Sequence, residues 1–152
     1  MYDSTRARDI PPSADLVAGY VDGRYAWSAA DWARWPVSKH VAITISAWHH
    51  NAIVLDVEPG DATPEQCNGW LTAIPAATGW IPTLYGNRPA LDRARHLAEL
   101  VKLEVDYWLA DWTGTPHLPI GFSACQYAAP GHGSPGHYDL SVVADNWPRA
   151  AT

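Results

Sequence analysis

The stretch Ile53-Val54-Leu55-Asp56-Val57-Glu58-Pro59-Gly60 is a short apolar run that carries two carboxylates and ends at a Pro-Gly pair. Its length, its β-branched residues and the breaker after it predict a buried strand. Because side chains alternate along a strand, Val54, Asp56 and Glu58 should share one face. Buried carboxylates are costly unless they are paired or hydrogen-bonded, and ligands of α/β proteins gather at the carboxyl ends of strands. The stretch therefore predicts either two acids that do chemistry or a structural pair in which Asp56 binds loop amides.

The composition is that of one globular domain. The chain has 152 residues, of which 47% are hydrophobic and 17% charged, so it can bury a sizeable core. A formal net charge of −6 without any basic run predicts no nucleic-acid partner and no attraction to an anionic membrane. Nine tryptophans are more than such a core needs, and rings that stay partly exposed often line sugar-binding sites.

Metal and cofactor chemistry is not expected from the spacing of its usual ligands. Cys67 and Cys125 permit one disulfide, but buried free thiols are the favoured interpretation because no metal or redox motif surrounds them. The pair His49-His50 and the loop histidines His132 and His137 have no recognised ligand spacing either, so we expect surface histidines. No Gly-rich strand-to-helix loop is found, which argues against a nucleotide-binding oxidoreductase. We therefore expect no metal and no cofactor.

Strand and helix patterns alternate along most of the chain. Helices are predicted within residues 27–35, from a capping box at Thr63 and Gln66 to about Ala77, and from Pro89 onward. Strands are predicted at residues 16–22, 41–46, 53–58, 81–87, 107–112, 120–128 and 138–143. This order favours parallel β/α units, and a first strand at Tyr2-Asp3 gives the eight strands of a (β/α)8 barrel.

The length limits what kind of barrel this can be. A (β/α)8 barrel usually needs about 200 residues or more. We therefore expect an irregular, trimmed (β/α)8 TIM-like barrel of the α/β class with reduced crossover helices. It should form a single domain over residues 1–147, followed by a short tail at 148–152. An open doubly wound sheet is the alternative.

Acids and aromatic residues fall where the predicted strands meet one rim. Paired carboxylates between aromatic walls are what glycoside hydrolysis requires, because one acid protonates the leaving oxygen while another acts as base, nucleophile or stabiliser of the cationic transition state. Backbones at positions i and i+2 of a strand lie about 6.6 Å apart, so the spacing of Asp56 and Glu58 permits either a retaining or an inverting enzyme. The rim residues are Asp3, Asp22, Asp56, Glu58, Tyr85, Asn87, Trp108, Trp112, Gln126 and Asp139.

A set of short motifs follows in a familiar order. They are Asp3 on the first strand, Asp56-Val57-Glu58, Pro82-Thr83-Leu84-Tyr85, Tyr107-Trp108-Leu109-Ala110-Asp111-Trp112, Gln126-Tyr127 and Tyr138-Asp139-Leu140-Ser141. Together they resemble the glycoside hydrolase family 25 lysozymes and the related glycoside-hydrolase-like domains of actinobacteria and their phages. The resemblance spans nearly the whole chain.

The resemblance implies a muramidase, which hydrolyses the β-1,4 bond between N-acetylmuramic acid and N-acetylglucosamine in peptidoglycan. It implies that Glu58 is the general acid and that Asp56 assists the 2-acetamido group of the substrate. Asp3 and Asp139 match further acids of the cleft, and the implied substrate-binding residues are Tyr85, Trp108, Trp112 and Gln126. Asp111 should face away from the site, because it alternates with Trp112 along its strand.

Two function classes follow from these expectations. The first is a peptidoglycan glycosidase, such as an endolysin of a bacteriophage or an actinobacterial lysin, acting as a monomer on the wall polysaccharide. The second is an inactive wall-binding or virion structural module on the same fold, favoured by the short chain and by the absence of a lysine or acid in residues 41–46. No signal segment and no apolar stretch of about 18 residues is found. We therefore expect a soluble chain that reaches a cell wall only if it is released or exported.

Overall fold

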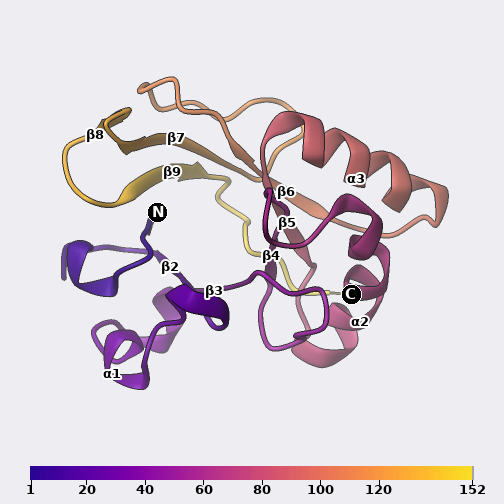
Figure 1. The fold of residues 1–152 in the computed structure, drawn as a ribbon, viewed down its shortest axis with the longest axis horizontal. Helices are drawn as coiled ribbons and strands as arrows, with labels where there is room; N and C mark the ends of the chain where they lie inside the picture. Colours follow the sequence, from indigo (N-terminus) through magenta and orange to yellow (C-terminus); the bar gives the residue numbers. More distant parts are fainter. Residues whose placement is uncertain (152) are drawn as a thin grey trace.

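Eight strands close into a barrel in the computed structural model, which describes residues 1–151 (Figure 1). Seven of them follow one another around the wall in chain order, each parallel to the next. They are β1 (Tyr2–Asp3), β2 (Val17–Tyr20), β3 (His40–Thr44), β4 (Val54–Asp56), β5 (Thr83–Gly86), β6 (Asp106–Ala110) and β7 (Ala124–Pro130). The eighth, β9 (Asp139–Val143), fills the gap between β7 and β1, and the two-residue β8 (Gly133–Ser134) pairs with the end of β7.

The direction of the last strand differs from the prediction. β9 runs antiparallel to both of its neighbours, so the expectation of parallel β/α units throughout is wrong for this strand. The difference affects the site, because the beginning of β9 now lies at the rim where β1 to β7 end. Asp139, the first residue of β9, is the direct partner of Asp3 in the ladder.

Crossover helices are reduced, as the short chain predicts. Two long helices, α2 (Cys67–Thr78) and α3 (Arg88–Leu100), join β4 to β5 and β5 to β6 and pack together on one side of the barrel (Figure 1). The connections on the other side contain α1 (Ala29–Trp32) and the 3-10 turns η1 (Ala7–Asp9), η2 (Gly23–Tyr25) and η3 (Val37–Lys39). The architecture is therefore an α/β barrel with an uneven outer layer.

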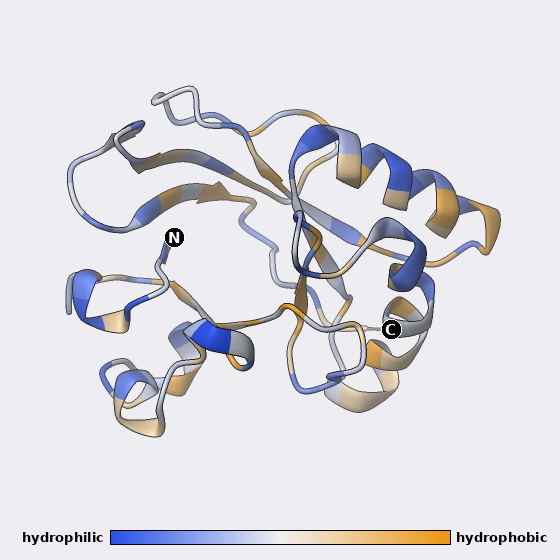
Figure 2. Cartoon of the chain, viewed as in Figure 1, coloured by the Kyte–Doolittle hydropathy of each residue, from blue (hydrophilic) through white to orange (hydrophobic). Residues whose placement is uncertain are grey.

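Local sequence signals explain where both long helices begin and end. Thr63 and Gln66 form a capping box around the short turn η4 (Pro64–Gln66), and α2 ends at Gly79, whose φ of 75° suits a residue without a side chain. Asn87 caps α3 by accepting a hydrogen bond from the backbone N–H of Ala90. The exposed face of α3 is polar (Figure 2). Its buried face rests on β5 and β6.

The alternation predicted for the opening stretch is present in β4. Leu55 and Val57 face outward into a cluster shared with α2 and α3, whereas Val54 packs inside the barrel with Trp108. Asp56 continues the inward face of the strand at the carboxyl end. The burial of apolar surface on both sides fixes the register, because a one-residue slip would exchange the two faces.

The end of the described chain is held against the barrel. The backbone of Arg149 accepts a hydrogen bond from Ile81, and the N–H of Ala151 donates to Gly79. The predicted tail at 148–152 is thus docked as far as residue 151, and Thr152 lies outside the described residues. Within residues 1–151, every helix is too short or too polar to cross a membrane.

Candidate functional site

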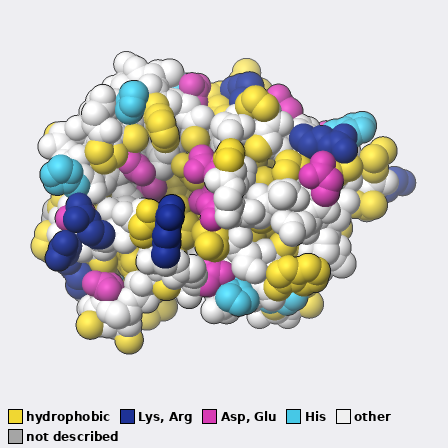
Figure 3. Space-filling model, viewed as in Figure 1, with side chains coloured by type: hydrophobic (Ala, Val, Ile, Leu, Met, Phe, Trp, Pro, Cys, Tyr) yellow, Lys and Arg dark blue, Asp and Glu magenta, His cyan; other side chains and the backbone are white. Residues whose placement is uncertain are grey.

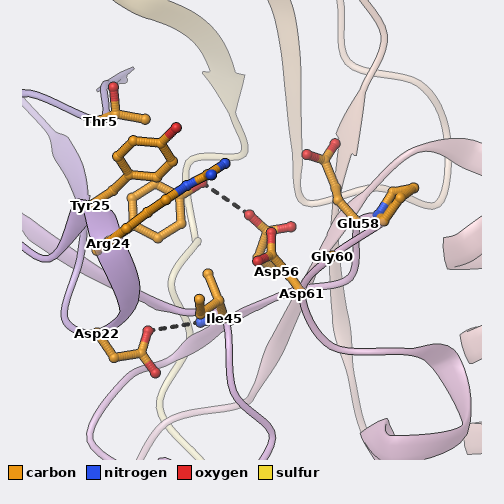
Figure 4. Close-up of a pocket in the computed structure, with 11 residues that line it drawn as sticks. Thr5, Asp22, Arg24, Tyr25, Ile45, Asp56, Glu58, Gly60 and Asp61 are labelled. Carbon is orange, nitrogen blue, oxygen red and sulfur yellow. Dashed lines mark hydrogen bonds between the residues drawn. The ribbon is translucent and has the colours of Figure 1, made fainter.

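A pocket of about 560 Å³ opens at the carboxyl end of β4. Asp56, Glu58 and Asp61 line one side of it, and Arg24 and Tyr25 line the other (Figure 4). Tyr20 also lines the pocket. We call these six residues the acid pocket. Acidic side chains gather around a hollow on this face of the molecule, with basic side chains beside them (Figure 3). The predicted pair of acids on β4 therefore faces open space.

Asp56 is almost completely buried at the inner end of this pocket, with 1% of its surface exposed. Its Oδ2 accepts a hydrogen bond of 3.0 Å from the hydroxyl of Tyr20, whereas its Oδ1 has no hydrogen-bond partner among residues 1–151. Burial and then the negative charge of Glu58 raise the pKa of Asp56 to about 8. Asp56 is therefore protonated at neutral pH in the free protein.

Glu58 lies two residues further on and is only partly buried. Burial, followed by the negative charge of Asp61, raises its pKa above the ordinary value for a glutamate. Because each of Asp56 and Glu58 is harder to ionise when the other is charged, the pair is suited to hold a single proton. Glu58 is the member that a ligand in the pocket can reach.

A second cluster lies inside the same rim, and Gln126 on β7 is its centre. The Oε1 atom of Gln126 accepts hydrogen bonds from the Tyr85 hydroxyl at 3.0 Å and from Trp112 Nε1 at 2.7 Å. Its Nε2 atom donates to Asp3 Oδ2 at 2.8 Å and to Asp139 Oδ2 at 3.2 Å. Because an indole nitrogen only donates, these contacts fix the orientation of the amide. We call these five residues the glutamine hub.

The two aspartates of the glutamine hub also have raised pKa values. Burial, followed by the negative charge of Asp139, raises the pKa of Asp3 well above its usual range. Burial raises the pKa of Asp139 to about 6, and the charge of Glu58 contributes to the rise. The influence of Glu58 on Asp139 links the acid pocket with the glutamine hub. The structure therefore brings all four predicted acids, from the ends of the three strands β1, β4 and β9, into one electrostatic unit.

The predicted substrate-binding residues differ in exposure. Trp112 has 50% of its surface exposed at the rim, and its ring lies against that of His132 with centroids 5.4 Å apart. Tyr85 and Gln126 are buried beneath it. Trp108 has no exposed surface, and its Nε1 donates to the Ser141 hydroxyl at 3.0 Å. The prediction that Trp108 contacts a ligand is thus contradicted, because an inward side chain of a small barrel fills the interior.

Two further predicted rim residues form hydrogen bonds that hold the fold, and one of them, Asp22, also lines the pocket (Figure 4). Asp22 accepts hydrogen bonds from the Thr44 hydroxyl at 2.6 Å and the Ile45 N–H at 2.9 Å, and it also contacts the ring of His49. Asn87 is occupied as the cap of α3. Asp111 lies outside the barrel, as the alternation with Trp112 predicts, and contacts His117.

Four residues of the acid pocket, Tyr20, Arg24, Tyr25 and Asp61, were not predicted from sequence. Tyr20 is the last residue of β2, and the carboxyl ends of the parallel strands form the rim. The same rule that predicts Asp56 at the rim therefore also applies to Tyr20. Arg24 and Tyr25 belong to the next turn, where the guanidinium lies 4.6 Å from the centre of the tyrosine ring. A turn of this kind carries no sequence signal for a pocket wall.

Fold and site together define an α/β barrel protein with clustered, partly protonated acids at the carboxyl rim. No protein-family model, curated protein or solved structure gives a significant match to the chain. Its function must therefore be argued from the geometry of the rim.

Proposed function

We propose that this protein is a glycosidase that cleaves the β-1,4 bond between N-acetylmuramic acid and N-acetylglucosamine in peptidoglycan. The observation that carries the proposal is the presence of Asp56 and Glu58 in one open pocket, each with a pKa raised above its ordinary value. Glycoside hydrolysis needs one protonated and one ionised carboxyl group beside the same bond. The barrel is, in this proposal, a trimmed relative of the (β/α)8 fold.

Glu58 acts as the general acid in this proposal because it is the accessible member of the pair. It gives its proton to the glycosidic oxygen as the bond to the anomeric carbon breaks. The oxygen of the substrate's 2-acetamido group then bonds to the anomeric carbon, and Asp56 stabilises the positive charge that develops. Water opens this intermediate and returns a proton to Glu58. The negative charge of ionised Glu58 raises the pKa of Asp56. When Glu58 is protonated this charge is absent, so Asp56 ionises more easily.

The aromatic residues of the rim are suited to hold the glycan. Tyr20 and Tyr25 line the pocket, and the half-exposed ring of Trp112 offers an apolar face with a wet edge. With a net charge of −6, the chain gains nothing from the anionic wall, so binding depends on such contacts. The setting we propose is a phage endolysin or actinobacterial lysin that acts as a monomer.

The test is the loss of turbidity of purified cell walls. Glu58→Gln should lower the rate by about 10²–10⁴-fold, the usual contribution of a general acid, while the melting temperature stays nearly unchanged. Glu65→Gln is the matched control, because Glu65 is exposed at the start of α2 and pairs with Arg93. Full activity of Glu58→Gln would refute the assignment of the acid.

A second candidate, a wall-binding module without catalysis, is favoured by one observation. Asp3 and Gln126 are buried in the glutamine hub, and all four polar sites of the Gln126 amide are already occupied. These two buried members of the hub stabilise the barrel without touching a substrate. Binding to insoluble peptidoglycan without release of reducing ends, and weakened by Trp112→Ala, would support this candidate.

A further inference from the structure

Three metal-binding side chains converge outside the barrel, on the opposite face of the wall from the glutamine hub. Asp111 follows β6, Cys125 is on β7, and His117 lies in the loop between these strands. One oxygen, nitrogen and sulfur atom from these residues all lie within 4.8 Å of one another. Because Cys125 alternates with Gln126 along β7, its side chain points away from the barrel interior.

The orientation of His117 decides how these atoms interact. Its Nδ1 lies 2.9 Å from the carbonyl oxygen of Thr115, which can only accept a hydrogen bond, so Nδ1 carries the ring proton. The other ring nitrogen, Nε2, faces Asp111 Oδ2 at 3.2 Å and Cys125 Sγ at 3.6 Å, and without an ion its N–H can donate to the carboxylate of Asp111. A histidine that ligates a metal through one nitrogen typically donates the other N–H to a carbonyl or carboxylate in this way.

Two of the three separations match those around a tetrahedral ion. Zinc binds histidine nitrogen and carboxylate oxygen at about 2.0–2.1 Å and thiolate sulfur at about 2.3 Å, which places neighbouring ligand atoms of a tetrahedron about 3.3–3.6 Å apart. The observed separations of 3.2 Å and 3.6 Å correspond to that geometry. The set of one sulfur, one nitrogen and one oxygen suits zinc among the abundant divalent ions.

We propose that Asp111, His117 and Cys125 form a zinc site with an open fourth position for water. His117 and Asp111 are partly exposed, so an ion can enter from solvent, while buried Cys125 forms its floor. The bound ion would tie the loop after β6 to β7. Trp112 is adjacent to Asp111 in the chain, so the ion would also hold the exposed ring of the rim in place. The spacing in sequence did not predict this site, because its ligands lie on separate elements and follow no known motif.

Cobalt(II) titration of the reduced, metal-free protein tests the site directly. A cobalt–thiolate bond gives a charge-transfer absorption in the near ultraviolet, and tetrahedral coordination gives visible bands. We expect both in the wild-type protein at one ion per chain, with loss of the bands on addition of zinc. Cys125→Ser should abolish the charge-transfer band, and His117→Ala should weaken binding at least tenfold.

Cys67→Ser is the matched control, because Cys67 is the other buried thiol, its S–H contacts the Thr63 carbonyl, and it takes no part in the cluster of Asp111, His117 and Cys125. This variant should keep the full cobalt spectrum. Zinc at a hundredfold excess over its Kd should raise the melting temperature of the wild type by about 5–10 °C, and that of His117→Ala by much less. Circular dichroism of each variant checks that it is folded. Absence of the charge-transfer band in the wild type, or its persistence in folded Cys125→Ser, would overturn the proposal.

Discussion

Two buried aspartates at opposite ends of the barrel have very different hydrogen-bond and charge partners. Asp106 begins β6 and is 4% exposed, and Asp56 ends β4 and is 1% exposed. Asp106 accepts hydrogen bonds from Arg149 Nη2 at 2.9 Å, from Arg149 Nε at 3.1 Å and from the Ser123 hydroxyl at 2.7 Å. Asp56 accepts a hydrogen bond from only one side chain, the hydroxyl of Tyr20, and contacts no cation among the described residues.

The carboxylate of Asp106 stabilises the fold, whereas the burial of Asp56 costs stability that the rest of the fold must offset. A buried charge with a cation and several donors is compensated, whereas a buried carboxyl group without a cation is stable only in its neutral form. Buried carboxyl groups without a compensating cation are found most often at functional sites. The comparison therefore favours chemistry at the carboxyl rim and a structural role for Asp106, and each prediction below tests one side of it.

The largest effect we expect is a fall in stability as pH rises. The pKa of Asp56 is about 8 in the folded state and about 3.9 in an unfolded chain, so between these values the folded state holds a proton that the unfolded state has lost. Stability contributed by the neutral acid is present at low pH and disappears as pH rises toward 8, at about 1.4 kcal/mol per pH unit for each such proton. Urea unfolding at pH 5, 6, 7 and 8 measures it. A free energy of unfolding that is flat over this range would contradict the protonated rim.

Asp106→Asn should destabilise the protein by about 2 kcal/mol, because it leaves Arg149 without its main partner. Full loss of a buried pair costs about 3–5 kcal/mol, and we expect less here because the Arg149 side chain is 33% exposed. Glu104→Gln is the control, since Glu104 is an exposed partner of the same arginine and should cost at most about 1 kcal/mol. Equal losses in the two variants would mean that Asp106 is no better compensated than a surface acid.

Much of this contrast could be predicted from the sequence, for reasons that are local. The capping box at Thr63 and the proline at position 89 place the starts of α2 and α3, and the alternation in β4 places Asp56 and Glu58 at the rim. Both cysteines are free and buried, as predicted. These features depend on a few neighbouring residues, so a single sequence contains them.

Other features depend on contacts between distant segments. The short connection at residues 131–138 leaves no room for a parallel crossover, and this was a usable sign that β9 is antiparallel. By contrast, no local pattern distinguishes buried Trp108 from exposed Trp112, because both follow the same alternation. The pairing of Asp106 with Arg149 joins residues 43 apart in sequence, and the pairing of Tyr20 with Asp56 joins residues 36 apart.

Asp56→Asn should have the opposite sign to Asp106→Asn. An asparagine has nearly the same shape, can still accept the Tyr20 hydrogen bond, and never ionises. We therefore expect similar stability of mutant and wild type at pH 5 and a gain of about 4 kcal/mol at pH 9, because ionisation of the free carboxyl group favours the unfolded wild type over this range and the mutant has no such group. Urea midpoints at the two pH values measure the difference. A loss of stability at both pH values would show that Asp56 is a structural acid like Asp106.

The smallest expected effect belongs to Tyr20→Phe, which removes the one hydrogen bond that favours the ionised form of Asp56. Loss of a single hydrogen bond should cost about 0.5–1.5 kcal/mol, and the pKa of Asp56 should rise further, because its carboxylate loses its donor. The pH at which the stability of the protein stops falling should therefore move upward. Tyr25→Phe is the matched control, since Tyr25 lines the same pocket while its ring is more exposed and its hydroxyl makes no hydrogen bond to residues 1–151. If the two variants shift the pH profile equally, the Tyr20 hydroxyl does not tune Asp56, and burial alone accounts for the difference between the two ends of the barrel.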